Sequence, residues 1–179
     1  TPELSRWVER YRFAQTHLPE AELPPVPDDV RLELLERACF GCTRFSELRQ
    51  VDLVAAWKST WPPGASRAVS EAAPDALPIP SGRRAKLRYR GVEPPVLSAR
   101  LQELFGLAET PRVARGRVPV VVELLAPNQR PVQVTQDLAS FWRTTYAEVR
   151  KELRQRYPKH HWPEDPAEGD PTARPGRRR

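Results

Sequence analysis

Apolar residues recur at helical spacing through the first seventy positions of the chain. The pattern predicts helices over residues 3–17, 30–40, 46–57 and 65–73. In the first of these, Leu4, Trp7 and Tyr11 recur at the spacing of one helical face. Asp29 stands immediately before the second and is a residue type that caps helix N-termini. Prolines separate these segments, so this part of the chain is predicted to be all-helical.

After residue 74 the hydrophobic period changes from helical spacing to alternation. Over residues 83–90, apolar positions alternate with cations, as in a strand with one buried face. Ser81 and Gly82 are turn residues that separate this run from a shorter extended run before it. Residues 118–125 and 132–135 are also extended, with a turn at 126–129, and predict a β-hairpin.

Two further helices complete the predicted pattern. Pro94 opens one over residues 94–108, where Leu97, Leu101 and Leu104 share a face. The other is a long helix over residues 137–157 that ends before Pro158. The predicted class is α+β. Its parts are an all-helical segment, a small ββ-α-ββ-α domain with a long C-terminal helix, and a disordered basic tail, at residues 1–75, 76–166 and 167–179.

Charge divides the chain in the same way as the hydrophobic pattern. Residues 1–80 hold nine Lys/Arg and twelve Asp/Glu, which gives −3, whereas residues 81–179 hold twenty and eleven, which gives +9. A polyanionic partner is therefore expected on the second part. No run of apolar residues is long enough to cross a membrane. The chain begins at Thr1 and contains no methionine, which suggests a piece of a longer protein.

The long predicted helix places basic side chains beside its apolar stripe. At about 100° per residue, Arg143, Arg150 and Arg154 align on one side and Lys151 lies next to them. This arrangement fits a ridge that contacts phosphates. A solvated helix face, partly compensated by Glu148, explains the same pattern, and the sequence does not decide between them.

The alternating strand is the second basic candidate. Arg84, Lys86 and Arg88 share one face of it, and a polyanion would relieve their mutual repulsion. An edge strand protected from aggregation by cations is an equally good explanation.

Two motifs suggest metal binding, redox activity or acid/base catalysis, but each lacks the partner residues that such a site needs. Cys39 and Cys42 form a CxxC, which is half of a zinc site or a redox pair, but no second CxxC follows and the motif ends a helix. His160 and His161 stand near carboxylates, yet no nucleophile motif accompanies them. We therefore predict no metal site and no catalytic residue in this chain.

Residues 77–166 resemble the C-terminal domain of bacterial HrpB-type ATP-dependent RNA helicases, which are DEAH/DExH-box enzymes of superfamily 2. The most specific stretches are DLASFWRTTY, EVRKELR and RYPKH. The resemblance implies a parent enzyme that couples NTP hydrolysis to RNA remodelling. The family's phosphate loop and DExH tetrad lie in upstream domains, and this chain contains neither motif. No cofactor is therefore expected here, while ATP and Mg²⁺ are expected in the parent's upstream domains.

Two roles for the region remain open from the sequence. In the first, it aids RNA binding through the basic strand and helix. In the second, it is a docking or structural module that packs on the parent's own helicase core or on a protein partner. The two cysteines are too few for a disulfide framework, which favours a reducing cytoplasm as its compartment.

Overall fold

The computed structural model describes residues 2–40, 44–48, 50–167 and 169–171. It divides into two compact units. The helical unit consists of Thr1–Pro74 and Tyr89–Glu93, and the sheet unit consists of Asp75–Arg88 and Pro94–Arg179. Most of the tail predicted to be disordered lies outside the described residues. Among the helices described, none is both long and apolar enough to span a membrane.

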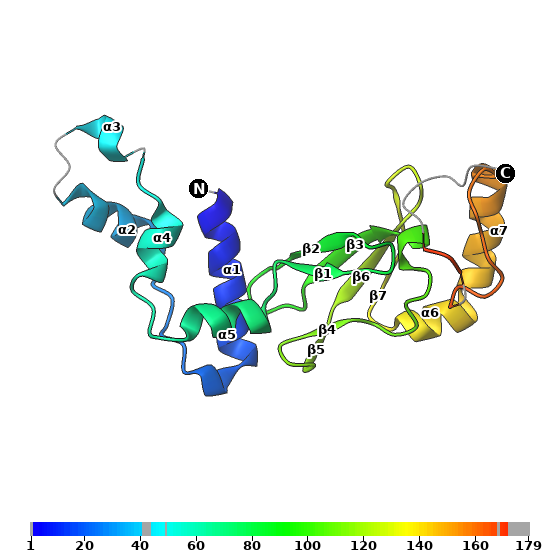
Figure 1. Ribbon diagram of the computed structural model, residues 1–179, viewed down its shortest axis with the longest axis horizontal. Coiled ribbons are helices and arrows are strands. Elements are labelled where there is room, and N and C mark those ends of the chain that lie inside the picture. The colour runs from blue at the N-terminus through cyan, green and yellow to red at the C-terminus, as the bar shows by residue number, and fades with distance from the viewer. Residues whose placement is uncertain (1, 41–43, 49, 168, 172–179) are drawn as a thin grey trace. The chain divides into compact units, whose positions relative to one another are not determined.

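The helical unit contains five helices and a 3-10 turn within its described residues (Figure 1). They are α1 (Pro2–His17), η1 (Pro19–Ala21), α2 (Val30–Cys39), α3 (Phe45–Leu48), α4 (Leu53–Lys58) and α5 (Ala65–Ala72). Tyr11 of α1 packs against Trp57 and Trp61, with ring centroids 5.1 and 4.8 Å away. The amide of Leu32 donates to the Asp29 carboxylate, which confirms the predicted cap of α2.

The single helix predicted over residues 46–57 is wrong. The chain forms two short helices there, because Asp52 caps a new helix that begins at Leu53. The Asp52 carboxylate accepts hydrogen bonds from the amides of Val54 and Ala55, both at 3.0 Å. The carboxylate of an aspartate competes with main-chain carbonyls for backbone N–H donors. This competition disfavours aspartate inside a helix and favours it at the N-cap.

The sheet unit is built on a five-stranded sheet in the order β1-β2-β3-β6-β7 (Figure 1). These strands are β1 (Ala76–Pro78), β2 (Arg84–Arg88), β3 (Val96–Arg100), β6 (Val121–Leu125) and β7 (Pro131–Thr135). All neighbours are antiparallel except β3 and β6, which are parallel. The predicted extended runs around Ser81–Gly82 and the hairpin around residues 126–129 are confirmed. The α+β class is confirmed with them.

The helix predicted over residues 94–108 is wrong, and with it the simple ββ-α-ββ-α order. Val96–Arg100 is strand β3, and Leu101–Leu104 is a 3-10 turn, η2. The buried positions Leu97, Ala99 and Leu101 alternate along an extended chain. Leu97, Leu101 and Leu104 fit both periods, and pairing with β2 and β6 decides in favour of the strand.

The connection from β3 to β6 determines how the sheet is covered. Parallel neighbours cannot be joined by a tight hairpin, so a long crossover is needed between them. The crossover contains η2 and a separate two-stranded hairpin made of β4 (Arg112–Val113) and β5 (Val118–Pro119). It supplies buried apolar residues to the core of the unit: Leu101, Leu104, Phe105, Val113, Ala114, Val118 and Val120.

The long helix predicted over residues 137–157 is broken into two. Helix α6 (Leu138–Thr144) is followed by Thr145, which separates it from α7 (Tyr146–Arg156). Two successive β-branched threonines stand at the break, and such residues lower helix propensity. Both helices lie beyond one end of the sheet (Figure 1). The indole Nε1 of Trp142 on α6 donates to the Leu107 carbonyl at 2.8 Å, which fastens α6 to the crossover.

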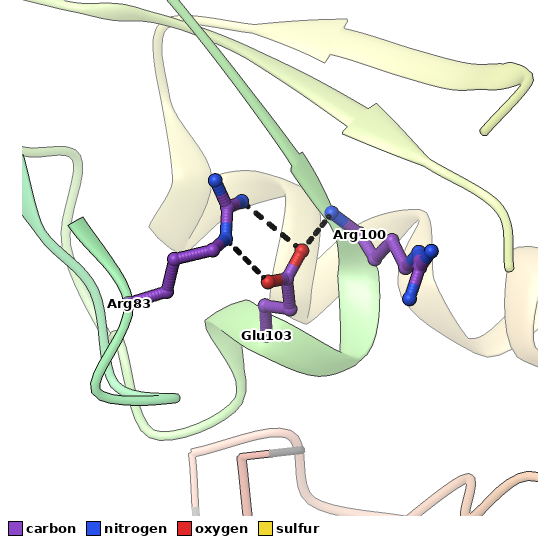
Figure 2. A network of polar contacts seen from close by, with 3 residues as sticks. All are labelled: Arg83, Arg100 and Glu103. Carbon is purple, nitrogen blue, oxygen red and sulfur yellow. Dashed lines mark hydrogen bonds and ion pairs between the residues drawn. The ribbon is translucent and has the colours of Figure 1, made fainter. Parts of the chain in front are cut away.

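A buried carboxylate holds the junction between β3 and η2 (Figure 2). Glu103 is 5% exposed. Its two oxygens accept from Nε and Nη2 of Arg83, at 2.7 and 3.1 Å, and from the Arg100 amide at 3.0 Å. The same residue therefore ties the β1–β2 turn to the start of the crossover. Charge-assisted hydrogen bonds of this kind are stronger than neutral ones.

We expect Glu103→Gln to destabilise the chain by about 1.5–3 kcal/mol, because the amide removes the charge that these hydrogen bonds need. Urea unfolding would measure the change. Glu109→Gln is the matched control, because Glu109 is an exposed carboxylate of the same crossover, and a surface change of this kind alters stability by less than about 0.5 kcal/mol. Equal stability of the two variants would contradict the role given to Glu103.

Candidate nucleic-acid interface

The predicted basic face of β2 exists as the alternation implied. Arg84, Lys86 and Arg88 are exposed, while Ala85 and Leu87 between them are buried. The three cations therefore point to the solvent-exposed face of the sheet, which we call its open face. Residues paired with them on the neighbouring strands point to the same face.

Two of these three cations are already engaged within the sheet. Nη2 of Arg88 donates to the Glu123 carboxylate at 2.8 Å and to the Ser98 hydroxyl at 3.0 Å. The Ser98 hydroxyl also bonds to Glu123, which lies opposite it in the β3–β6 pair. Nη2 of Arg84 donates to the Ala76 carbonyl at 3.0 Å. Lys86 has no side-chain partner within the part of the chain that the structure describes, so it is the most accessible charge of the strand.

The predicted basic residues of the C-terminal helices separate into two groups. Arg143 on α6, together with Lys151 and Arg154 on α7, is exposed and has no ion-pair partner among the described residues. The compensating pairs expected from Glu148 do not form there, and Glu152 instead lies 3.9 Å from Arg156. Lys151 and Arg154 border a surface hollow on α7, together with Ala147, Arg150 and Gln155. We call this the α7 hollow.

Arg150 differs from its neighbours because it holds the segment that follows α7. Its Nε donates to the Trp162 carbonyl at 3.0 Å, and its Nη2 lies 3.3 Å from Glu164, whose side chain is 90% exposed. The indole of Trp162 donates to the Tyr157 carbonyl, and the Tyr146 hydroxyl donates to the Pro163 carbonyl. Arg150 therefore holds the segment after α7 against the helix, and it also lines the α7 hollow.

The motifs with other possible chemistry gain no support. His160 packs between the rings of Tyr157 and Trp162, and burial, followed by the charge of Arg100, lowers its pKa. The lowered pKa favours the neutral form of its imidazole. Cys39 is exposed, while Cys42 lies outside the described residues. No group of three potential metal ligands occurs among the residues that the structure describes.

Sequence reasoning missed one group of cations. Arg112, Arg115 and Arg117 lie on the β4–β5 hairpin, and all three are exposed. The stretch RVARGRV carries the signal, because three arginines surround a glycine that turns the chain. The hairpin was not predicted, since each of its strands has only two residues.

Comparisons with known proteins agree on one family. The family model described as "ATP-dependent helicase C-terminal" (HrpB_C) matches residues 34–166. The ATP-dependent RNA helicase HrpB of Escherichia coli K12 is 40% identical over 178 residues, which are 97% of this chain and 22% of that protein. The chain thus spans about a fifth of the length of this relative.

Two solved structures are similar to the chain. The E. coli DExH-box NTPase HrpB matches with a TM-score of 0.87 and 40% identity, over 97% of this chain and 22% of that one. The E. coli DEAH/RHA helicase HrpB matches with a TM-score of 0.71 and 38% identity, over 90% of this chain and 21% of that one.

The phenol of Tyr146 provides a test of how the end of the chain is held. Burial raises the pKa of Tyr146 to about 12, and the nearby charge of Arg150 opposes this only in part. A raised pKa means that the unfolded phenol ionises first, so stability is complete below about pH 10 and is lost as pH rises towards 12. The stability of wild type relative to Tyr146→Phe should therefore fall by about 2 kcal/mol between about pH 9 and 12. Unfolding curves of both proteins across this range would measure it, and a difference independent of pH would contradict the assignment.

Proposed function

We propose that the sheet unit of this chain binds the phosphodiester backbone of RNA. The chain belongs to the HrpB-type family of ATP-dependent helicase C-terminal regions, and the proposal starts from that membership. The sheet unit would supply affinity for RNA to a helicase whose NTP hydrolysis takes place elsewhere in the parent chain. ATP and Mg²⁺ would bind there and not to this region.

The observation that carries the proposal is the α7 hollow. Lys151 and Arg154 border it without an ion-pair partner within the described residues, and Arg150 lies between them and the C-terminal segment. Residues 151 and 154 are one helical turn apart and so are neighbours on the helix surface. Two cations in this arrangement can contact phosphates of one strand without first breaking an ion pair.

The hollow supports contact with phosphates more than contact with bases. The aromatic residue of α7 itself, Tyr146, is buried in the core. Single-strand binders that stack bases need exposed rings, and α7 offers none next to these cations. The proposed binding is therefore independent of sequence and strongly dependent on salt.

A second candidate function is docking on the parent's helicase core. It is favoured by an exposed apolar side chain on the open face of the sheet, that of Val134, which is 54% exposed and lies opposite Glu123. In that case Arg88 and Glu123 would form part of a mixed apolar and charged protein interface. The two candidates use different surfaces of the sheet unit, so mutation of the α7 hollow separates them.

We expect Lys151→Glu/Arg154→Glu to weaken RNA binding by the 179-residue chain at least tenfold at about 0.1 M salt. The slope of log affinity against log salt should fall by about 1.4, or about 0.7 for each lost phosphate contact with a single strand. Fluorescence anisotropy with a labelled single-stranded RNA, titrated from about 50 to 200 mM salt, would measure both quantities.

The control is Arg6→Glu/Arg31→Glu, which makes the same change in net charge at two exposed arginines of the helical unit. This control should bind nearly as well as wild type if the contact is local. Undetectable binding by wild type at about 50 mM salt would overturn the proposal, since phosphate contacts are strong at low salt. An equal loss in the control would show that only net charge matters.

A further inference from the structure

We propose that the β4–β5 hairpin is a second contact for the RNA backbone, with Arg115 and Arg117 as the phosphate-binding side chains. This inference rests on the proposed function, because it assigns a second surface of the same unit to the same ligand. It is carried by the backbone conformation of the hairpin, by the way its tip is braced, and by its charge.

The tip of the hairpin has an unusual backbone. Ala114, Arg115 and Gly116 are consecutive residues in the left-handed region, with φ of 51°, 56° and 82°. This region is unfavourable for residues other than glycine, yet an alanine and an arginine occupy it here. An arginine is a poor choice for turn geometry alone, because glycine or asparagine would form the same turn with less strain. The strained position nevertheless places the Arg115 side chain at the exposed tip, where a ligand can reach it.

Arg112 braces the tip from the first strand. Its Nε donates to the Gly116 carbonyl at 2.5 Å, and its Nη2 donates to the Arg117 carbonyl at 3.1 Å. The amide of Arg117 also donates to the Ala114 carbonyl at 3.2 Å. These hydrogen bonds hold the backbone of the loop in one conformation. Arg115 and Arg117 therefore lose less backbone conformational entropy when they bind a ligand.

The base of the hairpin is anchored in the sheet unit. Val113 and Val118 face each other across the two strands and are buried, and Ala114 is also buried. Beyond the second strand, the Val120 amide donates to the Pro111 carbonyl at 3.0 Å. The exposed tip is therefore carried on strands whose valines are buried in the unit.

The charge of the hairpin is of one sign. Three arginines lie between residues 112 and 117, and no Asp or Glu occurs between Glu109 and Glu123. Guanidinium groups bind phosphate oxygens with two parallel hydrogen bonds, which suits them to backbone contacts. The exposed part of the hairpin carries no aromatic ring, so base stacking is not expected. The chemistry fits the phosphodiester backbone of RNA, read without regard to sequence.

Arg115→Gly is the most informative variant because it separates folding from binding. Glycine adopts the left-handed conformation freely, so the variant should melt no lower than wild type. Loss of one phosphate contact should nevertheless weaken RNA binding about fivefold at about 0.1 M salt. Thermal unfolding by circular dichroism and anisotropy titration of the 179-residue chain would provide the two measurements.

Two further variants complete the experiment. Arg115→Lys/Arg117→Lys keeps both charges and should retain most of the affinity, whereas Arg115→Glu/Arg117→Glu should lose at least tenfold at about 0.1 M salt. The control Arg130→Glu reverses one exposed charge in the turn between β6 and β7 and should have a smaller effect.

The outcomes distinguish this inference from the proposed function. If changes in the α7 hollow weaken binding and Arg115→Gly does not, the hairpin contact is wrong and the α7 hollow stands. If Arg115→Gly weakens binding while the α7 variant does not, the hairpin contact stands and the hollow is wrong. If wild type binds no RNA at low salt, both are overturned. A loss in Arg115→Gly that is accompanied by a lower melting temperature would also count against a direct contact.

Discussion

The parallel pairing of β3 with β6 is the constraint on which the rest of the sheet unit depends. In a sheet that is otherwise antiparallel, these two neighbours cannot be joined by a tight turn, and the chain between them must leave the sheet and return. This crossover contains η2, the buried carboxylate of Glu103, the β4–β5 hairpin and the Leu107 carbonyl, which accepts a hydrogen bond from Trp142 of α6. Glu103 sets the direction in which the crossover leaves, because it links the Arg100 amide at the end of β3 to Arg83 in a different turn. The placement of the helices and of the hairpin follows from this departure.

Local sequence was sufficient wherever local interactions decide the structure. The helix α1, the cap at Asp29 and the turn at Ser81–Gly82 depend on residues close in the chain, and each was predicted correctly. The alternation of β2 was also visible, because the pleat puts alternate residues on opposite faces. The region over 94–108 was mistaken because its leucines satisfy two periods, and the strand β6 that decides between them lies more than twenty residues later.

The candidate interface shows the same division between local and distant information. The sequence identified the exposed cations of β2 and α7, since exposure follows from periodicity. It could not show that Arg88 pairs with Glu123, or that Arg150 bonds to the Trp162 carbonyl, because these partners depend on the fold. The hairpin arginines escaped notice for another reason. Strands of two residues give no periodic signal, and the left-handed backbone at Arg115 contradicts the usual preference of that residue.

Internal carboxylates decide which of the basic surfaces is suited to a polyanion. On the open face of the sheet, Glu123 already accepts from Arg88, so a phosphate would have to replace an existing partner and leave a carboxylate beside it. The net gain from such an exchange is small, because the favourable contact is offset by the repulsion that remains. In the α7 hollow, Lys151 and Arg154 have no carboxylate in this position among the described residues, although Arg150 beside them pairs with Glu164. Affinity for phosphate therefore depends on where the acidic residues lie as much as on where the basic ones do, and by this criterion Lys151 and Arg154 of the last helix suit a phosphate better than Arg88 does.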